Sequence, residues 1–273
     1  DVGFIGYGGL MGTELPSTVV VRCYTAIGVF TSNLADCETE TVHGTAVTEA
    51  VVDMAPNVTL YIANPISGGD LNATASWMVS QGVQVINYSV GWTWDGPGDG
   101  TSPFSDSPLK AVDAAVAGGV LWVNAAGNAA LGNWFGGYSQ GIPNGWLEFA
   151  SGIEVNKVLL GAGETLTAQA RWDDSWGNAD TDLDLVLWNS TLDTVVDSSE
   201  DEQSGAAGQY PRERFTFTAP AAGAYYLALF HFAGAPPAWV QLNAFTQQAL
   251  DVPVAATSIG NPAESANTGM LAV

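Results

Sequence analysis

Residues 42–50 read VHGTAVTEA, and His43 in this stretch is one of only two histidines in the chain. It stands at the start of a segment in which apolar residues recur every three or four positions, the period of a helix. A histidine held at a helix start can act as a general base, because the ordinary pKa of imidazole is close to neutral pH. The alternative is a structural histidine that only fills space.

The elements around His43 alternate between strands and helices. A helix is expected from Thr45 to the stop at Ala55-Pro56-Asn57, and Asp70 is expected to cap a helix that ends near Gly82. Ser107 is expected to cap another helix, with Pro108 at its first position. The apolar segments between these helices are predicted strands: 19–24, 58–64, 83–90, 120–128 and the final MLAV. This order is typical of an α/β fold with a parallel sheet flanked by helices.

The pattern changes after Asn128. From about residue 153 to 246 the chain shows short alternating strands separated by turn residues, with no segment of helical period. This pattern is typical of an antiparallel β-sandwich. The last residues again resemble the segments before Asn128 and end in an apolar strand, so the sandwich is expected to be inserted within the α/β domain. We expect the α/β domain at 1–132 and 251–273 and the inserted domain at 133–250.

Composition limits the partners. The formal net charge of −22 speaks against binding to nucleic acid or to an anionic membrane, and no apolar run reaches the length of a membrane-spanning helix. Cys23 and Cys37 flank a loop of small polar residues and are either two free thiols or, as we favour, a disulfide. A disulfide predicts a secreted protein.

Three motifs follow one another in a specific order: VHGTAV at 42–47, VINYSVG at 85–91 and AAGN at 125–128. Together with the opening DVGF, this order resembles the subtilisin-like serine proteases over roughly 1–130 and 250–273. The resemblance implies a truncated subtilisin-like α/β domain and hydrolysis of peptide bonds in peptide or protein substrates. The inserted part, with GETLTAQARWDD and AAGAYYLAL, resembles the pre-peptidase C-terminal type of β-sandwich, which we expect to shape access for large protein substrates.

The resemblance also implies roles for single residues. Asp1 would orient His43 and stabilise its imidazolium form, and Asn128 would donate to the oxyanion. An alternative register places Gly6 at the position of Asp1 and leaves no acid; Asp1 is preferred because Val2-Gly3-Phe4 follows it as a turn. Asn128 could instead be an ordinary turn residue. The substrate would pair with the segments Ser89-Val90-Gly91 and Ala126-Gly127.

The nucleophile is expected beyond Val273. Gly100-Thr101-Ser102 has a suitable sequence, but it precedes Asn128 and stands in a loop rich in Gly, Pro and Asp. We therefore expect Ser102 to be a loop residue and this chain alone to be inactive. The alternative function is a non-catalytic module on a degenerate protease fold that binds protein or glycan.

The inserted domain carries an acidic group near a tryptophan-rich turn. Its spacing matches no EF-hand loop, so solvated acids and no cofactor are expected. If calcium binds, the candidate ligands are Asp173, Asp182 and Asp184. His231 lies in a predicted strand without clustered partners and is expected to be structural.

Overall fold

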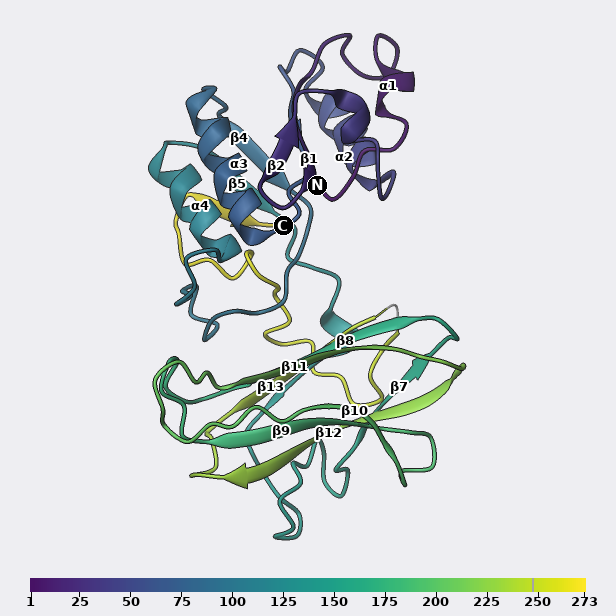
Figure 1. Ribbon diagram of the computed structural model, residues 1–273, viewed down its shortest axis with the longest axis vertical. Coiled ribbons are helices and arrows are strands. Elements are labelled where there is room, and N and C mark those ends of the chain that lie inside the picture. Colours follow the sequence, from purple (N-terminus) through teal and green to yellow (C-terminus); the bar gives the residue numbers. More distant parts are fainter. Residues whose placement is uncertain (247) are drawn as a thin grey trace. The chain divides into compact units, whose positions relative to one another are not determined.

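The computed structural model describes residues 1–246 and 248–273. The chain forms two compact units (Figure 1). Unit 1 comprises Asp1–Ala126 and Asn261–Val273, and unit 2 comprises Gly127–Gly260. Unit 2 therefore extends further at both ends than the inserted domain expected at 133–250. In the part of the chain described, no helix is long and apolar enough to span a membrane.

Unit 1 contains two small sheets of mainly parallel strands. In the first, β1 (Val20–Ala26) pairs in parallel with β3 (Tyr61–Ala63) and antiparallel with β2 (Val29–Thr31). In the second, β5 (Leu121–Asn124) lies between β4 (Val85–Tyr88) and β14 (Met270–Ala272), and both pairs are parallel. The final strand therefore joins the sheet of unit 1, although more than a hundred residues of unit 2 separate it from β5.

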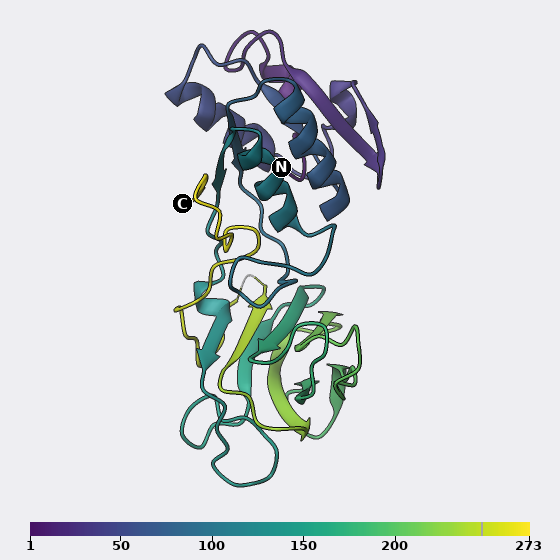
Figure 2. The ribbon, with the colours of Figure 1, turned by 90° about the vertical axis from the view of Figure 1, so that its left-hand side faces the viewer.

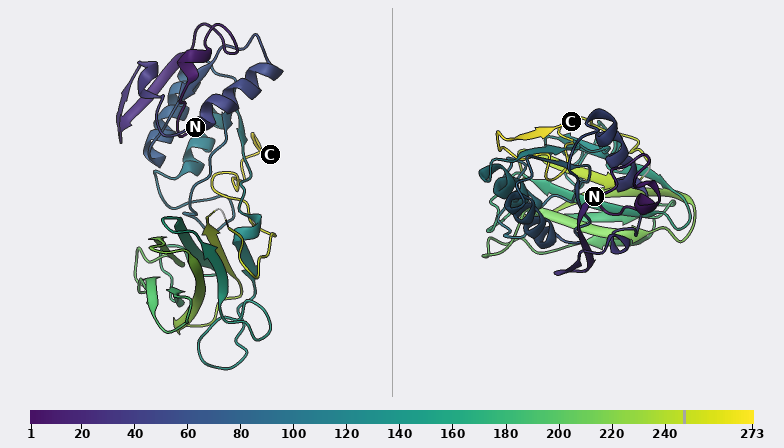
Figure 3. Two further views of the ribbon diagram at one scale, coloured as in Figure 1. Left: turned by 90° about the vertical axis from the view of Figure 1, so that its right-hand side faces the viewer. Right: turned by 90° about the horizontal axis from the view of Figure 1, so that it is seen from above.

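Four α-helices lie in unit 1. They are α1 (Tyr7–Leu10), α2 (His43–Met54), α3 (Gly68–Ser80) and α4 (Pro108–Ala117), and a short 3₁₀ helix η1 spans Leu34–Asp36. Helices α3 and α4 pack side by side and share an apolar core with β4 and β5 (Figures 1 and 3). A second core joins α2 to β1 and β3 and includes both cysteines.

The helix caps confirm one expectation and correct another. Ser107 caps α4 by accepting a hydrogen bond from Leu109 N at 3.2 Å, and Pro108 is the first helical residue, as predicted. Ser67, and not Asp70, is the N-cap of α3. The Ser67 hydroxyl accepts from Asp70 N at 3.1 Å and the Asp70 carboxylate accepts from Ser67 N at 3.1 Å, so the two residues form a reciprocal capping box.

Unit 2 consists of two four-stranded antiparallel sheets that face one another as layers (Figures 1 and 2). Alternate residues of a strand point to the same face, and Leu183, Leu185 and Leu187 of β9 are fully buried in the core of this unit. Burying one such side chain contributes about 2–3 kcal/mol. The strand orders are β10-β9-β12-β7 and β11-β8-β13-β6.

The strands of unit 2 have the following bounds: β6 Asn133–Gly136, β7 Asn156–Leu160, β8 Thr165–Trp172, β9 Asp182–Trp188, β10 Val195–Ser199, β11 Arg212–Thr218, β12 Gly223–Ala233 and β13 Val240–Phe245. A short 3₁₀ helix η2 (Ala130–Gly132) precedes β6. Leu250 N donates to Leu131 O at 2.9 Å, so the two ends of this strand-rich region lie side by side.

Candidate active site

His43 is the first residue of α2, and its ring is held against Asp1. The Nδ1 atom lies 2.9 Å from Asp1 Oδ2 and 3.0 Å from Asp1 Oδ1. The His43 side chain is 51% exposed, whereas that of Asp1 is only 6% exposed. A nearly buried carboxylate therefore contacts the Nδ1 edge of a ring that is half exposed.

The segment that carries Asp1 is fixed by backbone hydrogen bonds. The Asp1 backbone nitrogen donates to Ala63 O at the end of β3, at 3.0 Å. Asp1 Oδ1 also accepts from Val2 N at 2.7 Å, which orients the carboxylate. Gly44 N donates to Gly3 O at 3.0 Å, so the second residue of α2 binds the same segment directly. The acid and the base thus share one rigid support.

This support explains why Gly-Thr follows the histidine. A Cβ on Gly44 would lie 2.4 Å from Gly3 O and 2.8 Å from the Phe4 ring, so only glycine allows this approach. Thr45 donates its hydroxyl to Ile5 O at 3.1 Å. Both residues therefore attach the start of α2 to residues 3–5.

The geometry determines the state of the ring. Because a carboxylate accepts hydrogen bonds, we assign the proton of the neutral ring to Nδ1, which leaves the lone pair on Nε2. Within residues 1–246 and 248–273, no residue hydrogen-bonds to Nε2. The pair can therefore take a proton at Nε2 and stabilise the resulting imidazolium through Asp1.

Ser102 lies in the loop between β4 and α4, as expected. It is 8% exposed, its hydroxyl donates to Asp95 O at 2.9 Å, and its Oγ accepts from Phe104 N at 3.2 Å. The Ser102 hydroxyl therefore stabilises its own loop through these two hydrogen bonds.

The predicted substrate segment follows β4 directly. Ser89 Oγ accepts from Asn87 Nδ2 at 3.1 Å, and Gly91 is exposed. The next residue is anchored, because Trp92 N donates to Asn261 O at 2.7 Å. Val90 and Gly91 line a pocket of about 770 Å³. Their role in substrate binding stays a prediction.

Asn128 belongs to unit 2, whereas Asp1 and His43 belong to unit 1. Ala126 is the last residue of the first stretch of unit 1, and its N donates to Val273 O at 2.7 Å. Gly127 has a φ of +102° and begins unit 2, and Asn128 is exposed at a bend in that unit. The oxyanion role of Asn128 stays a prediction.

The candidate metal ligands lie on two strand ends. Asp173 is exposed directly after β8, whereas Asp182 and Asp184 share one face of β9. Burial raises the pKa of Asp184 to about 6, and the charges of Asp182 and Glu200 add to the shift. Among the described residues, no three acidic, histidine or cysteine side chains are grouped as a metal site.

His231 lies in β12 and is half-buried. Its ring packs edge-on against Tyr138, with centroids 5.5 Å apart, which agrees with a structural role.

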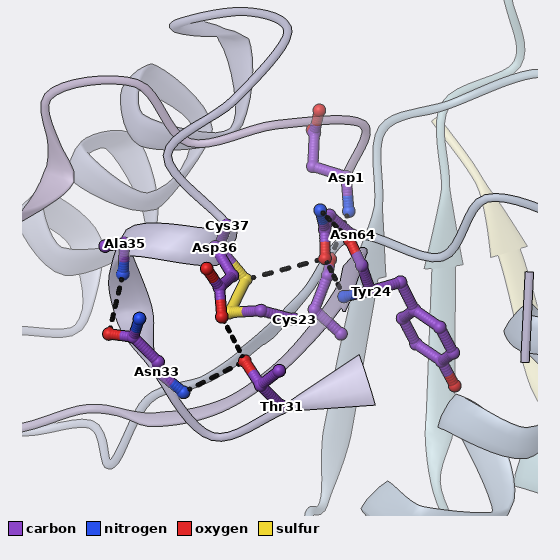
Figure 4. Close-up of a disulfide and its surroundings, with 10 residues drawn as sticks. Asp1, Cys23, Tyr24, Thr31, Asn33, Ala35, Asp36, Cys37 and Asn64 are labelled. Atoms are coloured by element: carbon purple, nitrogen blue, oxygen red, sulfur yellow. Dashed lines mark hydrogen bonds between the residues drawn. A yellow bond between two sulfur atoms is a disulfide. The ribbon is translucent and has the colours of Figure 1, made fainter. Parts of the chain in front are cut away.

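The two cysteines form a disulfide, as favoured from the sequence (Figure 4). Sequence reasoning did not single out Asn64, which lies beside this disulfide. Its buried side chain accepts from Tyr24 N at 2.7 Å and donates to Tyr24 O at 3.2 Å. Its position at the end of an apolar strand was the only feature of the sequence that could have pointed to a role for Asn64.

A further feature that the sequence did not predict is an apolar cavity of about 440 Å³ next to Asp1. It is lined by residues of β3 and β4 and by the inner faces of α2 and α3. Asp1 and Gly44 line this cavity, so the acid of the proposed pair borders an apolar surface.

Comparisons with known proteins support the resemblance. The model of the subtilase family matches residues 30–157. The solved structure of the CspB protease of Clostridium perfringens aligns with a TM-score of 0.51 and 12% identity, over 78% of this chain and 49% of that one. This chain therefore spans about half the length of that protease, and the likeness shows a subtilisin-like fold.

A second solved structure, the pre-peptidase C-terminal domain of a collagenase from Bacillus anthracis, aligns over 45% of this chain and 93% of that one. Its TM-score is 0.27 at 11% identity, which is too low to carry an argument. A comparison with curated proteins found no match. The subtilase family model thus matches residues 30–157, and the likeness to the solved protease shows a subtilisin-like fold.

Proposed function

We propose that this chain belongs to a secreted serine endopeptidase of the subtilisin type and supplies its acid and base. The observation that carries the proposal is the contact between His43 Nδ1 and the Asp1 carboxylate at 2.9–3.0 Å, in a histidine whose side chain is half exposed. The Cys23–Cys37 disulfide supports an oxidising compartment.

The chemistry follows from the ring geometry. A serine hydroxyl placed at Nε2 transfers its proton to His43 as its oxygen attacks the peptide carbonyl, and Asp1 stabilises the imidazolium. His43 then returns the proton to the leaving amine. In this proposal the serine comes from a segment outside residues 1–273, because the Ser102 hydroxyl is engaged within its loop. Asn128 would donate its side-chain amide to the oxyanion.

The substrate would bind as an added strand. An extended peptide that runs along Ser89-Val90-Gly91 can pair with this backbone, because the segment leaves β4 and is no longer paired as part of the sheet. Unit 2 carries no catalytic side chain in this proposal other than Asn128.

The test uses the full-length protein and a fluorophosphonate probe, which labels an activated serine. Wild-type protein is expected to be labelled, and His43→Ala should abolish labelling. Asp53→Asn, a substitution of an exposed acid at the other end of α2, should leave labelling unchanged. Absence of labelling in folded wild-type protein would contradict the proposal and would favour a binding module on a protease fold.

A further inference from the structure

The pocket of about 770 Å³ in unit 1 is lined by acidic residues and lies beside the predicted substrate segment. Val90 and Gly91 form one side of it, and Asp36 and Glu40 belong to the segment that leads into His43. Its lining contains two carboxylates and no lysine, arginine or histidine. The pocket is therefore negatively charged next to the segment on which the substrate is proposed to lie.

The two carboxylates are not neutralised by a cation. Asp36 Oδ2 accepts from the Thr31 hydroxyl at 2.6 Å, and Figure 4 shows this contact beside the disulfide. In the described part of the chain, the Glu40 carboxylate makes no hydrogen bond and no ion pair, and the residue is exposed.

Arg22 lies nearby but does not line the pocket. It donates to the Tyr24 hydroxyl at 2.8 Å and stacks on the Phe30 ring, 3.6 Å from its centroid.

The loop that carries these acids is held at both ends. Cys37 is fixed to β1 by the disulfide, and its carbonyl accepts from Phe4 N at 2.9 Å. On the other side of Glu40, Thr41 O accepts from Ile5 N at 2.9 Å. The same segment 3–5 thus positions the acids of the pocket and the pair of Asp1 and His43.

The pocket is within reach of the reacting centre. Glu40 precedes His43 by three positions, so their Cα atoms lie within about 11 Å of each other. Neighbouring residues of an extended peptide are about 3.3 Å apart along the strand, so a substrate side chain near the cleaved bond can reach this pocket.

We propose that this pocket selects substrates with a lysine or arginine side chain close to the cleaved bond. The proposal rests on the proposed function, because it takes Val90-Gly91 as the substrate segment. Glu40 and Asp36 provide the negative charge, and the half-buried Trp92 ring provides an apolar wall for the methylene stem of the cation. An acidic or neutral side chain gains nothing from these carboxylates.

The test measures binding, so that it does not depend on catalysis. Blocked hexapeptides of alanine carry one lysine at each position in turn, or norleucine at the same position, and are titrated into the 273-residue chain by calorimetry. At one position, lysine should bind about fivefold more tightly than norleucine. The preference should shrink when NaCl is raised from about 50 mM to about 500 mM.

Variants identify the groups responsible. Glu40→Gln should reduce the preference for lysine to less than about twofold, whereas Asp53→Asn, which removes a charge on α2 outside the pocket lining, should keep it. Glu40→Lys should reverse the preference toward a glutamate peptide. Unchanged circular dichroism would show that each variant is folded.

The results separate this proposal from the proposed function. No preference for lysine at any position, or a preference that survives both Glu40→Gln and Asp36→Asn, would overturn the pocket proposal even if the full-length protein reacts with a fluorophosphonate. A Glu40-dependent preference without fluorophosphonate labelling would support the pocket and contradict the peptidase.

Discussion

Replacing Gly44 by alanine should destabilise unit 1, although alanine is the better helix former. The new Cβ would lie 2.4 Å from Gly3 O and 2.8 Å from two atoms of the Phe4 ring, so the Asp1 segment or the start of α2 must move. Overpacking of this kind costs about 1–3 kcal/mol, whereas helix propensity returns at most about 1 kcal/mol. We expect a net loss of about 1–2 kcal/mol.

Gly69 provides a matched control. Gly44 and Gly69 are the second residues of α2 and α3, but a Cβ on Gly69 would find only Ser67 Oγ, at 3.7 Å. Gly69→Ala should therefore be neutral or should stabilise unit 1 by up to about 1 kcal/mol. The two variants should differ by about 1–3 kcal/mol in the free energy of unfolding.

The assay is urea unfolding followed by circular dichroism at a helical wavelength. The four described α-helices all lie in unit 1, so this signal reports the unfolding of that unit. Moving Gly3 should also disturb the contact of Asp1 with His43, which a change in the ¹⁵N chemical shifts of the His43 ring would reveal. Equal stabilities for Gly44→Ala and Gly69→Ala would refute the close approach at Gly44.

Two further predictions concern stability. Burial raises the pKa of Glu213 from 4.5 to about 7, although Ser199, Asp201 and Gln203 donate to its carboxylate. Between pH 4.5 and 7 the native protein then holds a proton that the unfolded chain releases, so the free energy of unfolding should fall by up to about 3 kcal/mol over this range. Calorimetry at several pH values should show this fall for the wild type and not for Glu213→Gln. An identical slope in the variant would contradict the assignment. The Cys23–Cys37 disulfide closes a loop with a sequence separation of 14, so a double serine variant should lose about 3 kcal/mol of stability, and titration of the unfolded, unreduced protein should detect no thiol.

Local signals were sufficient to predict several elements. The helix at His43 and the cap of α4 follow from apolar spacing and from a Ser-Pro pair, which act within a few residues. The cap of α3 was assigned wrongly to Asp70 because Ser67 and Asp70 are both good capping residues. Gly68 and Gly69, the first two residues of the helix, are poor helix formers, so the sequence does not show that the helix begins there. Strand bounds were predicted less well than strand positions: β4 spans only Val85–Tyr88 within the predicted strand 83–90, whereas β1 runs to Ala26, beyond the predicted end at residue 24.

Long-range contacts were beyond the reach of sequence patterns. Glycine is required at position 44 because the carbonyl of Gly3, forty-one positions away in the sequence, lies against it. The spacing of residues in the sequence does not predict this contact. Glu40 and Gly91 line one pocket because residues 3–5 hold the Glu40 loop, a contact that only the fold creates. The motif VHGTAV indicated a catalytic histidine, but the orientation of its ring depends on Asp1.

The most direct test of the central claim is the rate of peptide hydrolysis by the full-length protein with Asp1→Asn. If Asp1 holds the His43 ring with its proton on Nδ1, asparagine should lower kcat by about 10⁴-fold, because it favours the wrong tautomer and cannot stabilise the imidazolium. KM should change little, since the substrate does not contact Asp1 in this account. A folded Asp1→Asn enzyme with a kcat within about tenfold of wild type would contradict the assignment of Asp1 and His43 as the acid and base of a peptidase.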